Sequence, residues 1–161
     1  MSDAATVGLI SDTHGLMRPQ ALTAMQGCDL IVHAGDVGKP EILDQLKAVA
    51  PVVAVRGNID KGSWASQLPL TAVAKAGAVS IYVLHDIHEL DLDPAAAGFQ
   101  IVVSGHSHKP GRTERSGVVY INPGSAGPRR FRLPVTVARL DLRVSPWSVK
   151  FIDLCDTLGR R

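Results

Sequence analysis

The chain has few aromatic residues and few cysteines, and each scarcity limits what it can be. Phe, Trp and Tyr make up only 4% of the residues, so the core must consist of Val, Leu, Ile and Ala, as is typical of α/β proteins. Cys28 and Cys155 are far apart and form no Cys-x-x-Cys motif, so we expect free thiols in a cytoplasmic protein. No apolar run approaches the roughly 20 residues that span a bilayer, so we expect no membrane association.

A strong net charge is lacking as well. The formal net charge is +2, well short of the dense basic stripe of a nucleic-acid-binding domain, so nucleic-acid binding has little support. The 161 residues suit one domain, and no repeat, linker or low-complexity segment divides them. We therefore predict a single domain over residues 1–161, with residues 1–5 and 156–161 as flexible tails. The sequence leaves open whether the chain forms a homo-oligomer.

Short apolar runs alternate with segments of helical character in the first third of the chain. This alternation predicts βαβ units and a parallel sheet. The predicted strands are 6–10, 30–34 and 51–55, and the predicted helices are 19–26 and 41–49. Further along, the pattern predicts a hairpin, a short helix, two more strands and an antiparallel pair. These elements cover 70–76 with 79–84, then 94–97, 101–104, 118–121, and 135–142 with 149–154.

Six of these apolar runs end in polar clusters, which read SDTH, HAGD, RGN, LH, SGHSH and NPGS. Because the carboxyl ends of parallel strands meet at one edge of a sheet, side chains that are distant in sequence converge there. Seven of these side chains are candidate metal ligands. They are Asp12, His14, Asp36, Asn58, His85, His106 and His108.

The chemistry of these seven groups indicates two metal ions. All offer oxygen or imidazole nitrogen and none offers a thiolate, and seven donors exceed what one tetrahedral ion needs. Two ions that share a bridging carboxylate suit the set. The histidines favour Mn²⁺, with Fe, Zn²⁺ or Ni²⁺ as alternatives, over Mg²⁺ or Ca²⁺ alone. Such a pair stabilises both oxygens of a phosphoryl displacement, so we expect hydrolysis of a phosphate ester.

The polar clusters resemble, in the same order, the five motifs of the calcineurin-like metallophosphoesterases. The matching residues are Asp12-Thr-His14-Gly15, Gly35-Asp36, Gly57-Asn58, His85 and Gly105-His106-Ser-His108. The small size and the Asn122-Pro-Gly-Ser125 segment are similar to the compact phosphodiesterase branch that includes the bacterial YfcE proteins and vacuolar sorting protein 29. The resemblance implies an α/β fold of the metallophosphoesterase type. This fold is an αββα sandwich in which two mixed β-sheets are flanked by helices.

The resemblance also implies a role for each motif residue. One cation would take Asp12, His14, Asp36 and His108, and the second would take Asp36, Asn58, His85 and His106, with Asp36 bridging. Asn58, Asp60 and His85 would be the catalytic group, with Asp60 orienting a neighbour. Asn58, Arg129 and Arg130 are the candidates for binding substrate. The implied activity is dinuclear-metal-dependent hydrolysis of a small phosphodiester by a metal-bound hydroxide. The alternative is a non-enzymatic protein-binding scaffold similar to vacuolar sorting protein 29.

The sequence departs from the family pattern at two positions. Ile59 stands where many relatives have a histidine that protonates the leaving group, and isoleucine donates no proton, so diesters or activated esters are favoured. Asp86 follows His85 where a glycine is common, which could alter hydrogen bonding or repel an anionic substrate. His88 is the alternative to His85 as a ligand, and we interpret His33 as a core or supporting histidine.

Overall fold

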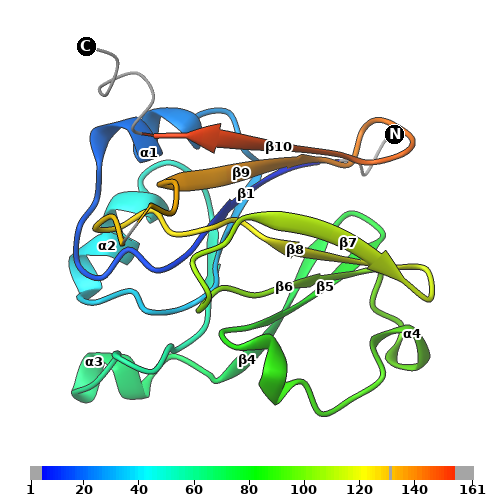
Figure 1. The fold of residues 1–161 in the computed structure, drawn as a ribbon, viewed down its shortest axis with the longest axis horizontal. Helices are drawn as coiled ribbons and strands as arrows, with labels where there is room; N and C mark the ends of the chain where they lie inside the picture. Colours follow the sequence, from blue (N-terminus) through cyan, green and yellow to red (C-terminus); the bar gives the residue numbers. More distant parts are fainter. Residues whose placement is uncertain (1–4, 131, 155–161) are drawn as a thin grey trace.

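The computed structural model describes residues 5–130 and 132–154, and two five-stranded sheets make up most of it (Figure 1). The strands of the first sheet are β1 (Thr6–Ile10), β2 (Leu30–His33), β3 (Val52–Ala54), β9 (Thr136–Asp141) and β10 (Ser148–Asp153). Those of the second sheet are β4 (Thr71–Ala76), β5 (Val79–Leu84), β6 (Ile101–Val103), β7 (Gly111–Arg115) and β8 (Val118–Asn122). The helices are α1 (Pro19–Ala24), α2 (Pro40–Lys47), α3 (Ser63–Ser66), the 3₁₀ helix η1 (Ile87–Glu89) and α4 (Pro94–Ala97).

Each sheet combines a parallel centre with antiparallel edges. The strand orders are β10-β9-β1-β2-β3 and β4-β5-β6-β8-β7. Strands β1, β2 and β3 are parallel, and so are β5, β6 and β8. Strands β9 and β10 form the expected antiparallel pair, and β4 and β5 form the expected hairpin. The structure therefore confirms the metallophosphoesterase-type sandwich of two mixed sheets.

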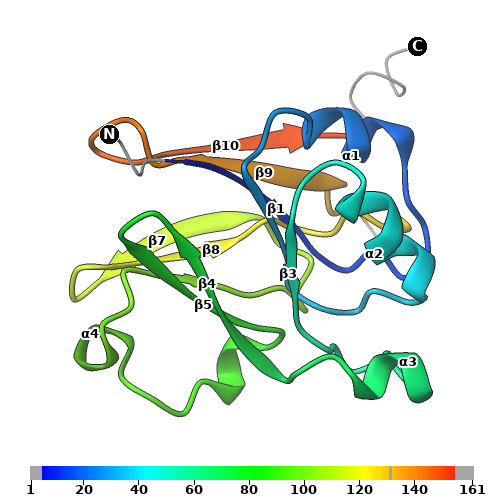
Figure 2. The same cartoon turned by 180° about the vertical axis from the view of Figure 1, so that it is seen from behind.

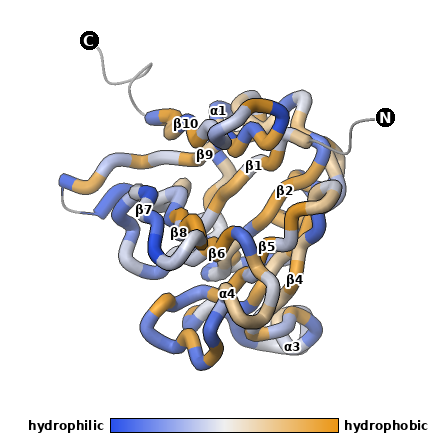
Figure 3. Tube along the Cα trace, turned by 90° about the vertical axis from the view of Figure 1, so that its right-hand side faces the viewer, coloured by the Kyte–Doolittle hydropathy of each residue, from blue (hydrophilic) through white to orange (hydrophobic). Residues whose placement is uncertain are grey.

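Alternation along the strands separates an inner core from an outer one. Val7 and Leu9 of β1 pack between the two sheets, whereas Ile10 packs in a second cluster with α1 and α2. Burial of one such side chain contributes about 1.5–3 kcal/mol to folding. In Figure 3, strands β1, β2 and β6 are coloured mainly as hydrophobic, whereas β7 is coloured as hydrophilic.

Helices α1 and α2 cover the outer face of the first sheet (Figure 2). Each begins with a proline at its first turn, where the missing N–H costs nothing. In α2, Ile42 and Leu46 are buried and pack against the first sheet. The outer face of the second sheet packs against the segment that contains η1 and α4. Asp93 caps the start of helix α4, and Gly98, which has a φ of 89°, caps its end.

Three elements were not expected from the sequence, namely β7, α3 and η1. All five residues of β7 are exposed, so the strand has no apolar alternation that would reveal it. Its antiparallel pairing with β8 places Gly111 opposite Asn122. Helices α3 and η1 span only four and three residues, too few for a helical period to show.

Some sequence predictions concern residues 1–4 and 155–161, which lie outside the described residues. Both expected tails fall there except for Ala5, which packs in the core between the sheets. Cys155 lies there too, while Cys28 is a buried free thiol. Within the described ranges, no helix has the length and apolar character needed to cross a membrane.

The inner core predicts a large cost for one truncation. Leu9 is fully buried between the sheets, so Leu9→Ala should destabilise the protein by about 2–5 kcal/mol through lost burial and the cavity left behind. Leu70→Ala is the matched control, because Leu70 is 63% exposed, and it should change stability by less than about 0.5 kcal/mol. Urea unfolding of both variants measures the difference, and equal losses would contradict this placement of the core.

Candidate metal centre

The candidate ligands lie in loops that follow parallel strands of both sheets. Asp12 follows β1, Asp36 follows β2 and His85 follows β5 directly. Backbone hydrogen bonds hold these loops together, because the N–H of Asp12 donates to Gly35 O (2.9 Å) and that of Gly105 donates to His85 O (2.9 Å). The sequence-based expectation that these strand ends converge is thus met in the structure.

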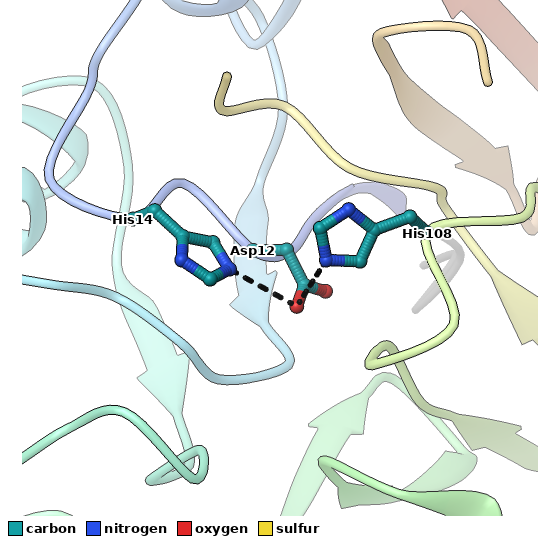
Figure 4. Close-up of side chains that lie close together, drawn as sticks. All are labelled: Asp12, His14 and His108. Atoms are coloured by element: carbon teal, nitrogen blue, oxygen red, sulfur yellow. Dashed lines mark ion pairs between the residues drawn. The ribbon is translucent and has the colours of Figure 1, made fainter. Parts of the chain in front are cut away.

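Two carboxylates lie at the centre of the cluster. Asp12 Oδ1 is 3.3 Å from His108 Nε2 and 3.7 Å from His14 Nε2, so both rings point at one oxygen (Figure 4). Asp36 Oδ2 lies 3.4 Å from His14 Nε2 and 3.3 Å from His85 Nε2. Asp36 therefore stands between two histidines, as a bridging ligand would. Asp12 Oδ1 also approaches His85 Nε2, at 3.9 Å.

Two groups of donor atoms are compact enough to hold a metal ion. The first combines Asp12, His14 and His108, and the second combines Asp12, Asp36 and His85. Within each group the donor atoms lie within 4.8 Å of one another. Both groups share Asp12, whereas the family resemblance implies Asp36 as the shared ligand.

Two other candidate ligands lie at the open side of the cluster. Asn58 Oδ1 is 3.0 Å from His85 Nε2, and the ring of His106 meets that of His85 edge-on at 5.2 Å. The N–H of His106 donates to Asp12 Oδ2 (3.1 Å). Its side chain is 45% exposed and its Nε2 is 3.7 Å from Asp86 Oδ2. His88 is 88% exposed and pairs with Asp86, so the structure brings His85 to the cluster and leaves its alternative outside.

The backbone at the candidate ligands adopts a conformation that side chains rarely take. Asp12, His14, Asp36, His106 and His108 have φ values of 56°, 49°, 57°, 72° and 65°. In residues 5–130 and 132–154 only one other non-glycine residue, Ser116, has a positive φ. The left-handed region costs about 1–3 kcal/mol per residue and persists where surrounding structure imposes it, often at functional sites. The concentration of such residues here indicates a site built for function.

Two motif glycines allow the loops to approach one another closely. A Cβ at Gly57 would overlap the backbone N and Oδ1 of Asp36. A Cβ at Gly105 would overlap Ser11 Oγ and lie 2.6 Å from Asp12 Oδ2. The glycines of the third and fifth motifs are therefore required by the packing of the carboxylates against the neighbouring loops.

Opposite charges in the cluster shift the pKa values of its members. The neighbouring Asp12 and Asp36 carboxylates raise the pKa of His14 to about 9 in the metal-free protein. Burial opposes charge on His85, but Asp36 and Asp12 outweigh it and raise its pKa. Burial also acts to raise the pKa of both aspartates, yet interactions with the histidines hold those pKa values well below the usual range. The carboxylates thus stay ionised and attract positive charge.

Several polar atoms of the cluster fit a divalent cation. Asp12 Oδ1 and His14 Nε2 are buried and make no hydrogen bond within the described part of the chain. Asn58 Oδ1 and His85 Nε2 face each other, an arrangement that needs either a proton on His85 or a shared cation. If neither the proton nor the cation is present, a rotated Asn58 amide could donate from its nitrogen to His85 Nε2 and to Asp36. These residues are thus compatible with the metal ions that the sequence predicts.

Asp60 binds the loops that carry the ligands. Its carboxylate accepts hydrogen bonds from the N–H groups of Gly57 (2.8 Å), Gly38 (2.9 Å) and Val37 (3.1 Å). Because Val37 adjoins Asp36 and Gly57 adjoins Asn58, one buried carboxylate fixes the second and third motifs relative to each other. This geometry suits the orienting role expected of Asp60, which remains a prediction.

A buried histidine supports the first two motifs. The Gly35 N–H donates to His33 Nδ1 (3.1 Å), so His33 Nε2 carries the hydrogen and donates to Thr13 Oγ1 (3.0 Å). Thr13 in turn donates to Val37 O (2.8 Å). Burial lowers the pKa of His33 to about 4, which keeps it neutral. His33 is therefore the core, supporting histidine that we expected.

Sequence reasoning missed the roles of Ser11 and Thr13, and it expected Asn122 to support the site through backbone geometry rather than through its side chain. Ser11 Oγ donates to Asp12 Oδ2 (2.5 Å). Asn122 Nδ2 donates to Gly105 O (3.0 Å) and Ser107 Oγ (3.1 Å), so it fixes the loop that carries the paired histidines. The only sequence signal for these residues was their position inside or beside the polar clusters.

Of the three candidates for substrate binding, Asn58 lines a cavity, whereas Arg129 and Arg130 do not line it. Arg129 and Arg130 are exposed and follow Gly127, which packs on the backbone of Asp12 and Thr13. A cavity of about 440 Å³ opens instead beside Asn58. Its lining comprises Arg56, Gly57, Asn58, Leu70, His85, Asp86, Glu89 and His106. Arg56 is thus a cation at the cavity that the sequence did not single out.

Comparison with known proteins settles the family. The model of the calcineurin-like phosphoesterase superfamily domain matches residues 6–145. The chain belongs to this superfamily. A probable metallophosphoesterase of Methanothermobacter thermautotrophicus is 33% identical over 148 residues, which cover 84% of this chain and 86% of that protein.

Solved structures share the fold of this calcineurin-like phosphoesterase. An archaeal phosphodiesterase has a TM-score of 0.75 at 20% identity, with 91% of this chain and 99% of the other covered. The Escherichia coli phosphoesterase YfcE has a TM-score of 0.70 at 24% identity, with 94% of each chain covered. Vps29 of Entamoeba histolytica in complex with Zn²⁺ has a TM-score of 0.63 at 23% identity, with 92% and 99% covered.

The packing at Gly105 predicts that a single methyl group disturbs the metal centre. Gly105→Ala should displace Ser11 and Asp12 and weaken Mn²⁺ binding by about tenfold or more, because support of a ligand contributes to metal affinity. Gly111→Ala is the control, since a Cβ there meets open space, and it should leave the affinity within about twofold. Calorimetric titration with Mn²⁺ compares the two, and an unchanged affinity in Gly105→Ala would contradict the close approach.

The raised pKa of His14 predicts that metal binding depends on pH. A cation needs the unprotonated ring, and with a pKa of about 9 in the metal-free protein the ring is mostly protonated at pH 7. Binding there displaces a proton, so affinity should rise by about tenfold per pH unit below pH 9 for each proton released. Mn²⁺ titrations at pH 6, 7 and 8, in buffers of different ionisation enthalpy, measure the slope and the released protons. An affinity independent of pH would refute the pairing of His14 with the carboxylates.

Proposed function

We propose that this metallophosphoesterase is a dinuclear-metal-dependent phosphodiesterase that acts on a small-molecule phosphoester. The observation that carries the proposal is the position of Asp36 Oδ2, at 3.4 Å from His14 Nε2 and 3.3 Å from His85 Nε2. A carboxylate between two separate sets of donors is the arrangement that a pair of ions requires. The archaeal phosphodiesterase with the same fold supports the choice of reaction.

The proposed ligand sets follow the family pattern. Asp12, His14, Asp36 and His108 would hold one cation, and Asp36, Asn58, His85 and His106 would hold the other. We propose Mn²⁺ as the metal because imidazole and carboxylate donors suit it. When bound, such cations lower the pKa of water and neutralise charge that develops on phosphoryl oxygens. A cytoplasmic location remains a prediction.

The protein groups around the centre would bind and orient the ester. Asn58 lies at the boundary between the ligand cluster and the cavity of about 440 Å³, so its amide can reach a phosphoryl oxygen. Arg56 lines the same cavity and offers a cation to a second anionic oxygen. Leu70 adds an apolar wall for the organic part of the ester. Arg129 and Arg130 stay candidates for contact with more distant parts of a substrate.

The leaving group restricts the class of ester. Ile59 is 38% exposed beside Asn58 and cannot protonate a departing alkoxide. Esters whose leaving group is stable as an anion need no such acid, so aryl and other activated diesters should react faster than simple alkyl esters. This property follows from a single side chain at the rim of the cluster.

The scaffold alternative is less well supported by the geometry. A protein that only binds partners has no use for buried polar atoms without a hydrogen bond or for five candidate ligand residues with left-handed backbone, each of which costs stability. The Zn²⁺ complex of a Vps29 nevertheless means that metal binding alone does not separate the two functions. The decisive readout is therefore hydrolysis.

The proposal predicts that hydrolysis requires both metal and Asp36. The purified protein with Mn²⁺ should hydrolyse bis(p-nitrophenyl) phosphate, lose this activity on chelation and regain it when Mn²⁺ is restored. Asp36→Asn should lower the rate by roughly a hundredfold or more, because the bridging charge is lost. The control Asp44→Asn alters an exposed residue of α2 and should keep the full rate. Equal activity in Asp36→Asn would contradict the bridging role of this carboxylate, and a wild type that binds Mn²⁺ without hydrolysis of mono- or diesters would favour the scaffold.

A further inference from the structure

Asp86 is the carboxylate that lies against His106 on the open side of the metal centre. Its Oδ2 is 3.7 Å from His106 Nε2, an ion-pair distance slightly longer than a hydrogen bond. It comes directly after His85, at the position where the family resemblance implies a glycine. The five family motifs assign no role to this charged side chain.

The side chain of Asp86 is held in place by its own loop. Its Oδ1 accepts the backbone N–H of His88 (3.0 Å) and lies 3.0 Å from His88 Nδ1. These contacts make Asp86 the N-terminal cap of η1. One oxygen is thus engaged within the loop, and the other remains for His106. The carboxylate is a fixed partner rather than a freely moving charge.

The backbone of His106 is also held in place, so the contacts of its ring decide how the ring is oriented. Its N–H donates to Asp12 Oδ2 at 3.1 Å, and its φ is 72°. The ring meets His85 at a centroid distance of 5.2 Å and an angle of 79°. With Nε2 directed at Asp86, the remaining ring nitrogen is Nδ1. A carboxylate that accepts from one nitrogen of an imidazole leaves a lone pair on the other and orients it toward a metal.

We infer that Asp86 is a positioning residue whose carboxylate pairs with His106 Nε2 and thereby presents His106 Nδ1 to the second cation. This inference rests on the proposed dinuclear centre. In the described ranges, Asp86 pairs with His88 and His106 and with neither His14 nor His108. Its effect is therefore specific to the cation that His106 would share with Asn58 and His85. Engaged in this way, Asp86 adds less repulsion toward an anionic substrate than a free carboxylate would.

The inference is tested by counting and titrating the cations rather than by hydrolysis. Asp86→Asn keeps the size of the side chain and an oxygen for the His88 N–H, but removes the charge. Titration with Mn²⁺ should show the second binding step weakened by about 10- to 100-fold and the first changed by less than about threefold. Asp91→Asn, an exposed residue five positions on, is the matched control and should alter neither step. Asp86→Glu, which retains a carboxylate, should recover most of the second affinity.

A double variant shows whether Asp86 acts through His106. In a His106→Asn background, adding Asp86→Asn should cause no further loss of the second cation, because the group that it positions is gone. Thermal unfolding without metal checks that each variant is folded. Multiplicative losses in the double variant, equal weakening of both cations, or an unchanged second affinity in Asp86→Asn would each overturn the inference. A wild type that binds fewer than two cations would overturn the dinuclear proposal itself, which is a distinct result.

Discussion

The structure depends on the burial of two carboxylates beside the same histidines. Asp12 is fully buried and Asp36 is nearly so, and a buried carboxylate without a positive partner costs several kcal/mol. Protons on His14 and His85 can supply the charge, as the raised pKa values of both rings indicate. Divalent cations would supply more charge at the same place. The centre is thus a site that demands positive charge whichever species provides it.

The conformation of the surrounding loops brings the candidate ligands close to these two carboxylates. Left-handed backbone at the ligands turns each side chain inward within one or two residues of a strand end. Glycines at 57 and 105 let neighbouring loops lie against Asp36 and Asp12. Asp60 and His33 then accept hydrogen bonds from the backbone N–H groups of these tightly packed loops. Strained geometry persists because many short-range contacts determine it together.

The sequence predicted the centre better than it predicted its supports. The convergence of the candidate ligands could be predicted because oxygen and nitrogen donors at the ends of parallel strands meet at one edge of a sheet. Most strands and helices could be found from apolar periodicity, although the second sheet was expected only from the family resemblance. Strand β7 could not be found in this way, because every residue in it is exposed and it has no apolar alternation. The partners of Thr13 and Asn122 are distant in the sequence, and spacing in the sequence does not encode such contacts.

The division of the ligands between the two sheets has a mechanical consequence. Asp12, His14, Asp36 and Asn58 follow strands of the first sheet, whereas His85, His106 and His108 follow strands of the second. The apolar layer between the sheets holds them together without fixing them at any one point. An ion bound by residues of both sets would act as a non-covalent cross-link at one end of the sandwich. Its binding free energy would have to be lost before the sheets could separate there, so such a cofactor would also be a part of the fold.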